Sequence, residues 1–380
     1  MHKNIIPDGT RDLTNEDCIK RSKIITAINS IFISWGYKEV ITPSIEFYDS
    51  FRYEYSGLRE EKIYKFFDSK GRILALRPDM TIPIVRLVST RFKDINESIK
   101  LRYTSNIFRV FEDFSGKRNE YTECGIELIT KEKNFSDLEA LIIAIEALKK
   151  AGVEDFKLEI GEANFFKAAI EDLNISSEEK ILLSELIENK NLQELKVLLE
   201  GLNLDNKIKD TFYKLPLIFG EGIEVLNAYK EISFSDNMLK SIKTLENLAY
   251  RLETLGYKEY ITFDLGITAR VNYYTGIIFR GFINGAGSVI LSGGRYDNLI
   301  KSAKKDFNAI GFSINVDELV NILPINLDKK TKFKIIFNKE KEIEAVKESI
   351  RLRNEGFVVE LIASYEEKEI KVLREEYYGG

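Results

Sequence analysis

Four short segments of this 380-residue chain place charged, hydroxyl or glycine residues beside predicted strands. They are RPDMT (77–81), FR (108–109) with ECGIE (123–127), NYYTG (272–276) and SGGRYD (292–297). Because side chains alternate along a strand, Glu123 and Glu127 share one face, with Gly125 leaving room between them. Paired carboxylates can hold an ammonium group, and the guanidinium of Arg109 can grip a carboxylate. This hairpin therefore predicts a slot for a small molecule charged at both ends, such as an amino acid.

Two of these segments also have a simpler structural explanation. Arg109, Glu123 and Glu127 fit a strand face that is exposed to solvent. Asp79 and Thr81 fit the cap and first turn of a helix, where both residue types are favoured. The residues alone leave the choice between a binding role and a structural role open.

The other two segments are equally ambiguous. Of Tyr273 and Tyr274, one side chain is expected to face into the core of the sheet and the other to face out, and filling the core is the simpler role. Gly293 and Gly294 fit a tight turn, because glycine adopts positive φ without cost. They also fit a place where the backbone must approach a ligand closely, and the two interpretations stay open.

The count of imidazole and thiol groups excludes several kinds of catalysis. The chain has one histidine, His2, and two distant cysteines, Cys18 and Cys124. Ser-His-Asp and Cys-His catalysis need an ordered imidazole, which we do not expect of a histidine at the second position, and multi-histidine zinc sites need more than one histidine. We expect reduced cysteines, no metal site and no cofactor.

The charge balance argues against nucleic-acid and membrane partners. The chain has 56 Lys+Arg against 61 Asp+Glu, a formal net charge of −5, so no overall positive field attracts it to RNA or anionic lipid. Hydrophobic residues make up 44% and charged residues 31%, as in ordinary globular domains without a membrane span. The first residues, MHKNIIPDGTRD, lack the apolar stretch of a secretory signal. We therefore expect a cytoplasmic protein.

The elements around these segments indicate an α+β fold. Apolar periodicity predicts a helix over 15–35, and alternation predicts a strand over 38–47, with Pro43 marking an edge or a bulge. A strand is predicted at 72–76, and a long hairpin joins 99–111 to 120–129. Further strands are predicted at 261–265, 276–282, 288–292 and 311–315.

Two regions differ from this mixed pattern. Residues 164–257 read as successive amphipathic helices, which indicates a helical insertion within the core domain of 1–324. Residues 325–380 read as strand, helix and strand, which predicts a small C-terminal α/β subdomain.

Seven segments in order resemble the catalytic core of class II histidyl-tRNA synthetases, over roughly residues 5–322. They are PDGTRD (7–12), GYKEVITPSIEF (36–47), RPDMT, the FR and ECGIE hairpin, NYYTGIIF (272–279), SGGRYDNL (292–299) and AIGFSINVDEL (309–319). The resemblance implies an antiparallel sheet flanked by helices and a dimer interface at the first motif, 36–47. It also implies that the hairpin binds ATP and amino acid, and that YYT and GGRYD close a histidine pocket.

The chain departs from the synthetases at the residues that matter for their reaction. Glu318 stands where their last motif has an arginine that holds the phosphates of ATP, and a carboxylate there repels a triphosphate. Ala269 stands where their histidine-specific arginine lies. Arg270 is displaced by one position, which on a strand points it to the opposite face, and Asn272 replaces an aspartate. Residues 325–380 are also too short for an anticodon-reading domain, so aminoacylation is not expected.

The regulatory subunits of ATP phosphoribosyltransferase, which are non-catalytic relatives, also lack these arginines, have a shortened tail and carry RPDMT where the synthetases have RPEGT. The chain resembles that family. The resemblance implies a partner, the short-form catalytic subunit, within a hetero-octamer that contains a homodimer formed through the first motif. It implies a role in histidine biosynthesis and in feedback by L-histidine, with no tRNA and no membrane as partner.

The resemblance also implies a ligand site, active or vestigial. Its residues are Asp79, Thr81, Arg109, Glu123, Glu127, Tyr273, Tyr274, Gly293, Gly294 and Tyr296. Glu123 stands where the synthetases have glutamine, which adds a negative charge. Two alternatives remain: a divergent histidyl-tRNA synthetase, and a stand-alone histidine-binding regulator.

Overall fold

The computed structural model describes residues 6–52, 58–111, 117–268, 273–284, 289–301, 304, 306–324, 329–366 and 368–378. The chain divides into two compact units. The first comprises Ile24–Leu323 together with the residues up to Arg11, and the second comprises Asp12–Lys23 and Pro324–Gly380. No helix in the described part of the chain is long and apolar enough to cross a membrane.

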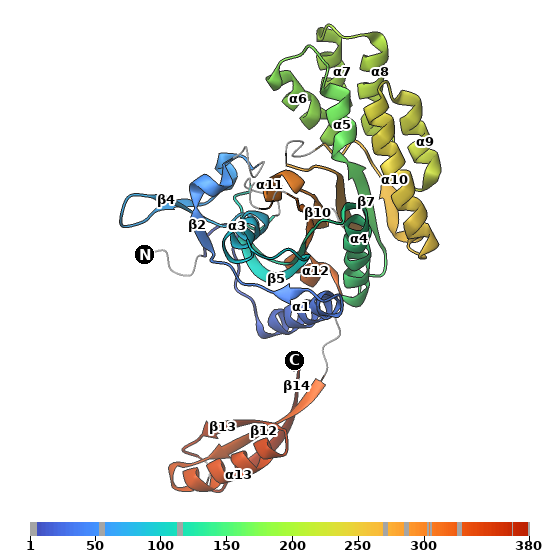
Figure 1. Ribbon diagram of the computed structural model, residues 1–380. Helices are drawn as coiled ribbons and strands as arrows, with labels where there is room; N and C mark the ends of the chain where they lie inside the picture. Colours follow the sequence, from blue (N-terminus) through green and yellow to red (C-terminus); the bar gives the residue numbers. More distant parts are fainter. Residues whose placement is uncertain are drawn as a thin grey trace. The chain divides into compact units, whose positions relative to one another are not determined.

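The first unit is built on an eight-stranded sheet (Figure 1). In spatial order its strands are β1 (Lys38–Glu39), β5 (Ile99–Phe108), β6 (Glu120–Thr130), β11 (Asn308–Asn315), β10 (Val289–Arg295), β9 (Ile277–Ile283), β7 (Phe156–Glu162) and β8 (Ile261–Phe263). The strands pair antiparallel except at the two edges, where β1 with β5 and β7 with β8 are parallel. The predicted long hairpin is confirmed as β5 and β6, and the predicted α+β class is confirmed with it.

Helices cover both faces of this sheet. They are α1 (Asn15–Ser34), α3 (Thr81–Arg91), α4 (Lys133–Lys150), α11 (Asp297–Lys301) and α12 (Val316–Ile322). Phe32 of α1 meets Phe312 of β11 edge to face, and α4 lies against the same strand. On the opposite face, Ile84 and Val88 of α3 are buried with Leu101 of β5 in one apolar cluster.

Between β7 and β8 the chain forms only helices, in agreement with the predicted helical region. They are α5 (Ala163–Ile170), α6 (Ser177–Glu188), α7 (Leu192–Gly201), α8 (Asn206–Lys214), α9 (Gly222–Ile232) and α10 (Asp236–Thr254). Side-chain caps mark several starts: Ser176 accepts from Glu179 N–H in a capping box, and Ser235 accepts from Met238 N–H. Figure 1 shows these helices as one layered group.

The prediction of one strand over 38–47 is wrong. The segment forms β1 and, after a break, β2 (Ile45–Phe47), which belongs to a separate sheet with β4 (Ile73–Leu76) and β3 (Lys65–Phe67). Pro43 lies in the break. It has no N–H to donate to a strand ladder, so the chain leaves one sheet there and enters another.

The C-terminal residues form their own small sheet. β12 (Lys329–Phe337) and β13 (Val358–Ala363) pair in parallel across α13 (Glu342–Asn354), which is the predicted strand–helix–strand pattern. A third strand, β14 (Lys371–Tyr378), pairs antiparallel with β12 and was not predicted. Ile335, Ala345 and Leu352 are buried between this sheet and its helix.

Candidate functional site

The β5–β6 hairpin places Glu123, Gly125 and Glu127 on one face of the sheet, as predicted. Gly125 pairs directly with Tyr103. A Cβ at Gly125 would lie only 2.4 Å from the hydroxyl oxygen of Tyr103, so the tyrosine ring occupies this space. The prediction that Gly125 leaves an open slot between the carboxylates is therefore wrong, because a cross-strand side chain fills the gap.

Glu127 lies at the centre of the site and is almost completely buried. Its carboxylate accepts hydrogen bonds from the hydroxyls of Tyr296 and, at 3.3 Å, Thr81. Burial raises the pKa of Glu127 to about 8, and the negative charges of Asp79 and Glu123 add to the rise, against the lowering effect of the two hydroxyls. Near neutral pH this carboxyl is therefore largely protonated, and a ligand cation beside it would favour its ionised form.

Of the two carboxylate oxygens of Asp79, one accepts a hydrogen bond and the other does not. Its Oδ1 accepts from Ile82 N–H at 3.2 Å, so Asp79 caps the first turn of α3, as its structural interpretation predicted. Its Oδ2 is buried, and no hydrogen bond reaches that atom within the described part of the chain. A buried polar atom without a partner is rare in proteins and is a suitable acceptor for a ligand's N–H.

Arg109 lies one residue beyond the end of β5. Its Nε donates to the carbonyl oxygen of Pro78 at 2.6 Å, which links the guanidinium to the segment that carries Asp79. Burial alone would lower the pKa of Arg109, but the neighbouring Tyr121, Glu123 and Asp79 outweigh it, so the pKa rises and the group stays cationic.

Tyr273 and Tyr274 precede β9 and do not lie on a strand. Strand alternation therefore does not orient the two rings, but Tyr273 is buried in the apolar core and Tyr274 is only half-buried. The two rings meet edge to face with centroids 4.9 Å apart, and Tyr273 also lies 6.1 Å from the ring of Tyr296. Burial raises the pKa of both Tyr273 and Tyr296 well above the usual tyrosine value, so both hydroxyls stay protonated.

Gly293 and Gly294 lie inside β10, so the tight-turn prediction is wrong. A Cβ at Gly293 would lie 2.4 Å from Cβ of Phe312, and one at Gly294 would lie 2.7 Å from the ring of Tyr274. Close packing of side chains against the strand requires both glycines. The next residue, Arg295, is fully buried away from the site.

Arg295 has a structural role in joining β10 to α4. It forms ion pairs with Asp137 of α4 and, at 3.0 Å, with Asp297. It also donates to the carbonyl oxygen of Lys133 at 2.9 Å and to the hydroxyl of Ser136. These bonds use most of the donors of the guanidinium, so Arg295 is not available to a ligand.

All ten residues predicted for the site surround one small cavity of about 50 Å³, called the inner cavity here. That space corresponds to on the order of four water molecules. Six further residues complete its wall: Met80, Tyr103, Ser292, Gly311, Phe312 and Ser313. The structure thus brings together segments that are more than two hundred positions apart in the chain.

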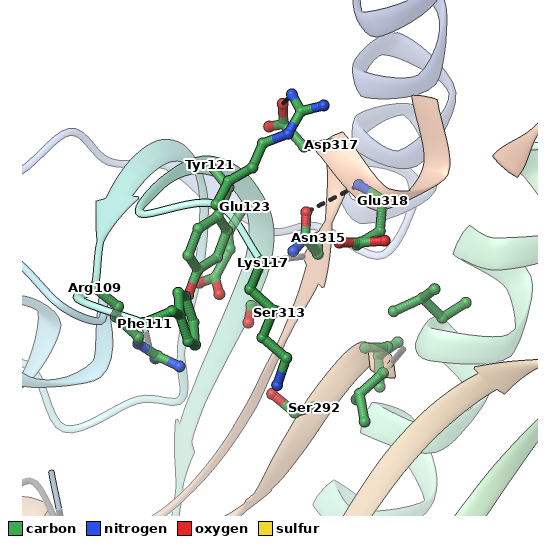
Figure 2. A pocket seen from close by; sticks show the side chains of 14 residues that line it. Arg109, Phe111, Lys117, Tyr121, Glu123, Ser292, Ser313, Asn315, Asp317 and Glu318 are labelled. Atoms are coloured by element: carbon green, nitrogen blue, oxygen red, sulfur yellow. Dashed lines mark hydrogen bonds and ion pairs between the residues drawn. The ribbon is translucent and has the colours of Figure 1, made fainter. Parts of the chain in front are cut away.

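A larger pocket of about 270 Å³, the outer pocket, adjoins the inner cavity and shares with it Arg109, Glu123, Ser292 and Ser313 (Figure 2). Its other lining residues are Phe111, Lys117, Arg118, Tyr121, Val289, Ile290, Leu291, Asn315, Asp317 and Glu318. Three cationic and three carboxylate side chains line the outer pocket, so its formal charge balances.

Glu318 belongs to the first turn of α12, which points its carboxylate toward the outer pocket region. Its main-chain N–H donates to Oδ1 of Asn315 at 3.1 Å, the capping bond drawn in Figure 2. The neighbouring Asp317 is already engaged: it pairs with Arg11 at 2.8 Å and accepts from Thr122 N–H at 2.7 Å. Glu318 thus lines the outer pocket, which adjoins the inner cavity.

Comparison with known proteins identifies the family. A family model described as histidyl-tRNA synthetase matches residues 9–319. An ATP phosphoribosyltransferase regulatory subunit from Clostridium kluyveri is 40% identical, over 97% of this chain and 96% of the relative. A relative of the same name from Alkaliphilus metalliredigens is 34% identical, over 95% of this chain and 92% of the relative. The chain belongs to the ATP phosphoribosyltransferase regulatory subunit family.

A solved structure agrees with this assignment. A protein from Bacillus halodurans described as an ATP phosphoribosyltransferase regulatory subunit/histidyl-tRNA synthetase superposes with a TM-score of 0.86 at 28% identity. The match covers 97% of this chain and 95% of that protein. The class II synthetase-like fold predicted from the motifs is thereby confirmed for this member of the regulatory subunit family.

Sequence reasoning missed two residues that shape the inner cavity of this regulatory subunit. Tyr103 fills the gap at Gly125, and Gly311 on β11 pairs directly with Glu127 on β6. The alternation of apolar residues along 99–107 could have indicated that Tyr103 faces the same side as Glu127, but only the strand register shows the contact. The predicted departures at Ala269, Arg270 and Asn272 lie outside the described residues.

Proposed function

We propose that this chain catalyses no reaction by itself and is the regulatory subunit that the short-form ATP phosphoribosyltransferase requires for activity. The reaction is the first step of L-histidine biosynthesis, and the chain contributes to its feedback by L-histidine in the cytoplasm. The names and near full-length coverage of the relatives support this role.

The observation that carries the non-catalytic part of the proposal is the position of Glu318 on the outer pocket. A synthetase needs an excess of positive charge there to hold a triphosphate and the charge that develops during adenylate formation. In this chain Arg109, Lys117 and Arg118 face an equal number of carboxylates. Because Asp317 also pairs with Arg11, these three cations outnumber Glu123 and Glu318 by only one. A triphosphate would gain little net attraction and would approach Glu318 directly, so ATP activation is not supported.

We place L-histidine in the inner cavity, extending toward the outer pocket. The unbonded Oδ2 of Asp79 and the carboxyl of Glu127 offer acceptors for its ammonium group, and Arg109 offers a donor for its carboxylate. The inner cavity alone is small, but four shared residues connect it to the larger pocket. Bound histidine would change the partner's activity only by favouring one of two states of the complex.

An apolar sheet face supports a homodimer through the first motif. The register of β2, β4 and β3 places five apolar side chains on one face: Ile45, Phe47, Phe66, Leu74 and Leu76. Ile45 and Phe47 are 47% and 49% exposed. A contiguous exposed apolar face of this kind is typical of an interaction surface, and β2 belongs to the first motif. We propose that a second copy covers it within the hetero-octamer.

Binding of tRNA is not part of the proposed function. We propose that 325–380 forms a separate subdomain after a core domain of 1–324. Its three-stranded sheet with one helix is smaller than the anticodon-reading domain of the synthetases. The chain is also acidic overall, with a net charge of −5.

Two measurements test this proposal against its alternatives. Sedimentation of the chain mixed with the short-form catalytic subunit should show a hetero-oligomer larger than either protein alone. Histidine-dependent exchange of pyrophosphate into ATP should be absent. Exchange activity would instead identify a divergent synthetase, and histidine binding without complex formation would identify a stand-alone regulator.

A further inference from the structure

The helical region carries a polar groove that the proposed function does not use. On α10, Lys240, Lys243, Thr244, Asn247 and Arg251 follow one another at intervals of one, three or four residues, so they lie along one side of the helix. From Lys240 to Arg251 this side spans about 16 Å at the helical rise per residue.

Two hollows meet along this side of α10. One of about 590 Å³ lies between α5, α6 and α10, and another of about 390 Å³ lies between α10 and the first turns of α4. Both are lined by Lys240 and Thr244, so the two hollows adjoin, and together they are called the α10 groove here. Each hollow is within the usual size range of small-molecule sites.

Cationic side chains outnumber carboxylates in the α10 groove. The cations are Lys167, Lys180, Lys240, Lys243 and Arg251, and the carboxylates are Glu162, Glu171 and Asp137. This local excess of positive charge contrasts with the net charge of −5 of the whole chain.

Two of the three carboxylates are already engaged by the protein. Asp137 pairs with the buried Arg295. Glu162 is buried, and its Oε1 accepts from the main-chain N–H of Asn164 at 3.0 Å and from its side-chain amide at 2.9 Å. Glu162 keeps its charge because Asn164 is neutral, so five cations face two carboxylates, Glu162 and Glu171, and a bound anion would still meet a positive field.

Two of the cations are free to bind an anion. Among the described residues, no hydrogen bond or ion pair is found for the ammonium groups of Lys180 and Lys243. Lys240 makes one contact, to Oδ1 of Asn237 at 3.1 Å. The amide of Asn247 adds a neutral hydrogen-bond donor, whereas the hydroxyl of Thr244 already donates to the carbonyl oxygen of Lys240 at 3.1 Å.

The lining also indicates the class of ligand. Only Ala168, Ile170 and Leu248 are apolar among the residues that line the α10 groove. An apolar ligand would bury little matching surface there, whereas phosphate oxygens suit several lysine and arginine side chains with neutral donors between them. We propose that the α10 groove binds a small phosphorylated metabolite, with Lys240 and Lys243 as its main anion contacts.

Inorganic pyrophosphate is a suitable probe, measured by calorimetric titration of the full chain at low ionic strength. We expect saturable binding, and we expect Lys240→Gln and Lys243→Gln each to weaken it about three- to tenfold. The matched control is Lys196→Gln on α7, an exposed lysine with a single 4.0 Å pair to Glu200, which should leave pyrophosphate affinity unchanged.

Three results would overturn the proposal. The first is the absence of saturable pyrophosphate binding. The second is that Lys117→Gln loses pyrophosphate binding while Lys243→Gln keeps the wild-type affinity, which would place the anion in the outer pocket. The third is an RNA oligonucleotide that binds through Lys240 and Lys243 and is not displaced by pyrophosphate. None of these results depends on complex formation with the catalytic subunit, so the test is independent of the proposed function.

Discussion

The carboxylate of Glu127 occupies the space that any side chain at Gly311 would need. The two residues pair directly on β6 and β11, and a Cβ at Gly311 would lie 1.7 Å from Oε2 of Glu127. The absence of a side chain at position 311 therefore lets Glu127 lie flat against the sheet, where it reaches Tyr296 and Thr81. Both residues line the inner cavity.

Replacing Gly311 by alanine should displace Glu127 from its two hydroxyl partners. We expect a loss of about 1–3 kcal/mol in the free energy of unfolding, because the backbone or the carboxylate must move to admit the methyl group. Urea denaturation measures this. The control is Gly201→Ala at the end of α7, where nothing lies within 4 Å of the new Cβ. Equal stability of the Gly311→Ala variant and the wild type would contradict the described contact.

Removing the ionisable group of Glu127 should flatten the dependence of stability on pH. Burial raises the pKa of Glu127 to about 8 from 4.5, so between these values the native state binds more protons than the unfolded state. Native stability therefore falls as pH rises through this window, and above about pH 8 the contribution is fully lost.

In Glu127→Gln the slope of unfolding free energy against pH between 5 and 8 should be shallower by as much as about 1.4 kcal/mol per pH unit. A slope remains, because burial also raises the pKa of Glu159 to about 7 and of Glu162 to about 6. Denaturant unfolding at several pH values checks this. An unchanged slope would mean that Glu127 titrates normally in the native state.

Breaking the buried ion pairs of Arg295 should destabilise the fold without touching the inner cavity. Arg295→Met removes the cation paired with the buried Asp137 and leaves Asp297 with only Lys133 at 3.7 Å, so we expect a loss of about 3–5 kcal/mol in urea denaturation. Arg52→Met is the control, because its pair with Asp49 is exposed and should contribute less than about 1 kcal/mol. Similar losses in both variants would contradict a structural role specific to Arg295.

A charge on the apolar sheet face should weaken the proposed homodimer. Phe47→Lys places an ammonium group among the side chains of Ile45 and Leu74, so we expect dimer affinity to fall at least about tenfold by analytical ultracentrifugation. Phe67→Lys is the matched control: Phe67 is 73% exposed but lies on the opposite face of the same sheet. Loss of the dimer only in the Phe67→Lys variant would contradict this proposal, because the interface would then lie on the opposite face of the sheet.

The hairpin and its two carboxylates were predictable from sequence because alternation along a strand depends only on local geometry. Glu123 and Glu127 lie on the predicted face, and Asp79 caps α3 as its residue type indicates. The ordered motifs predicted the class II fold, because their order reflects the arrangement of the whole sheet.

The errors arose where contacts between distant strands decide the outcome. Two consecutive glycines favour a turn locally, yet Gly293 and Gly294 lie inside β10 because Phe312 and Tyr274 pack against them. Tyr103 and Gly311 could not be assigned to the cavity without the register of β5, β6 and β11. Register is set by tertiary pairing, which a single strand's pattern does not reveal.

The proposed function requires that this chain activates a separate catalytic subunit. The most direct measurement is the rate of phosphoribosyl-ATP formation by the short-form catalytic subunit while this chain is added in increasing amounts. The account predicts negligible activity without the chain, a saturable rise as it is added, and inhibition of that activity by L-histidine. A rate that stays the same at every concentration of this chain would contradict the account.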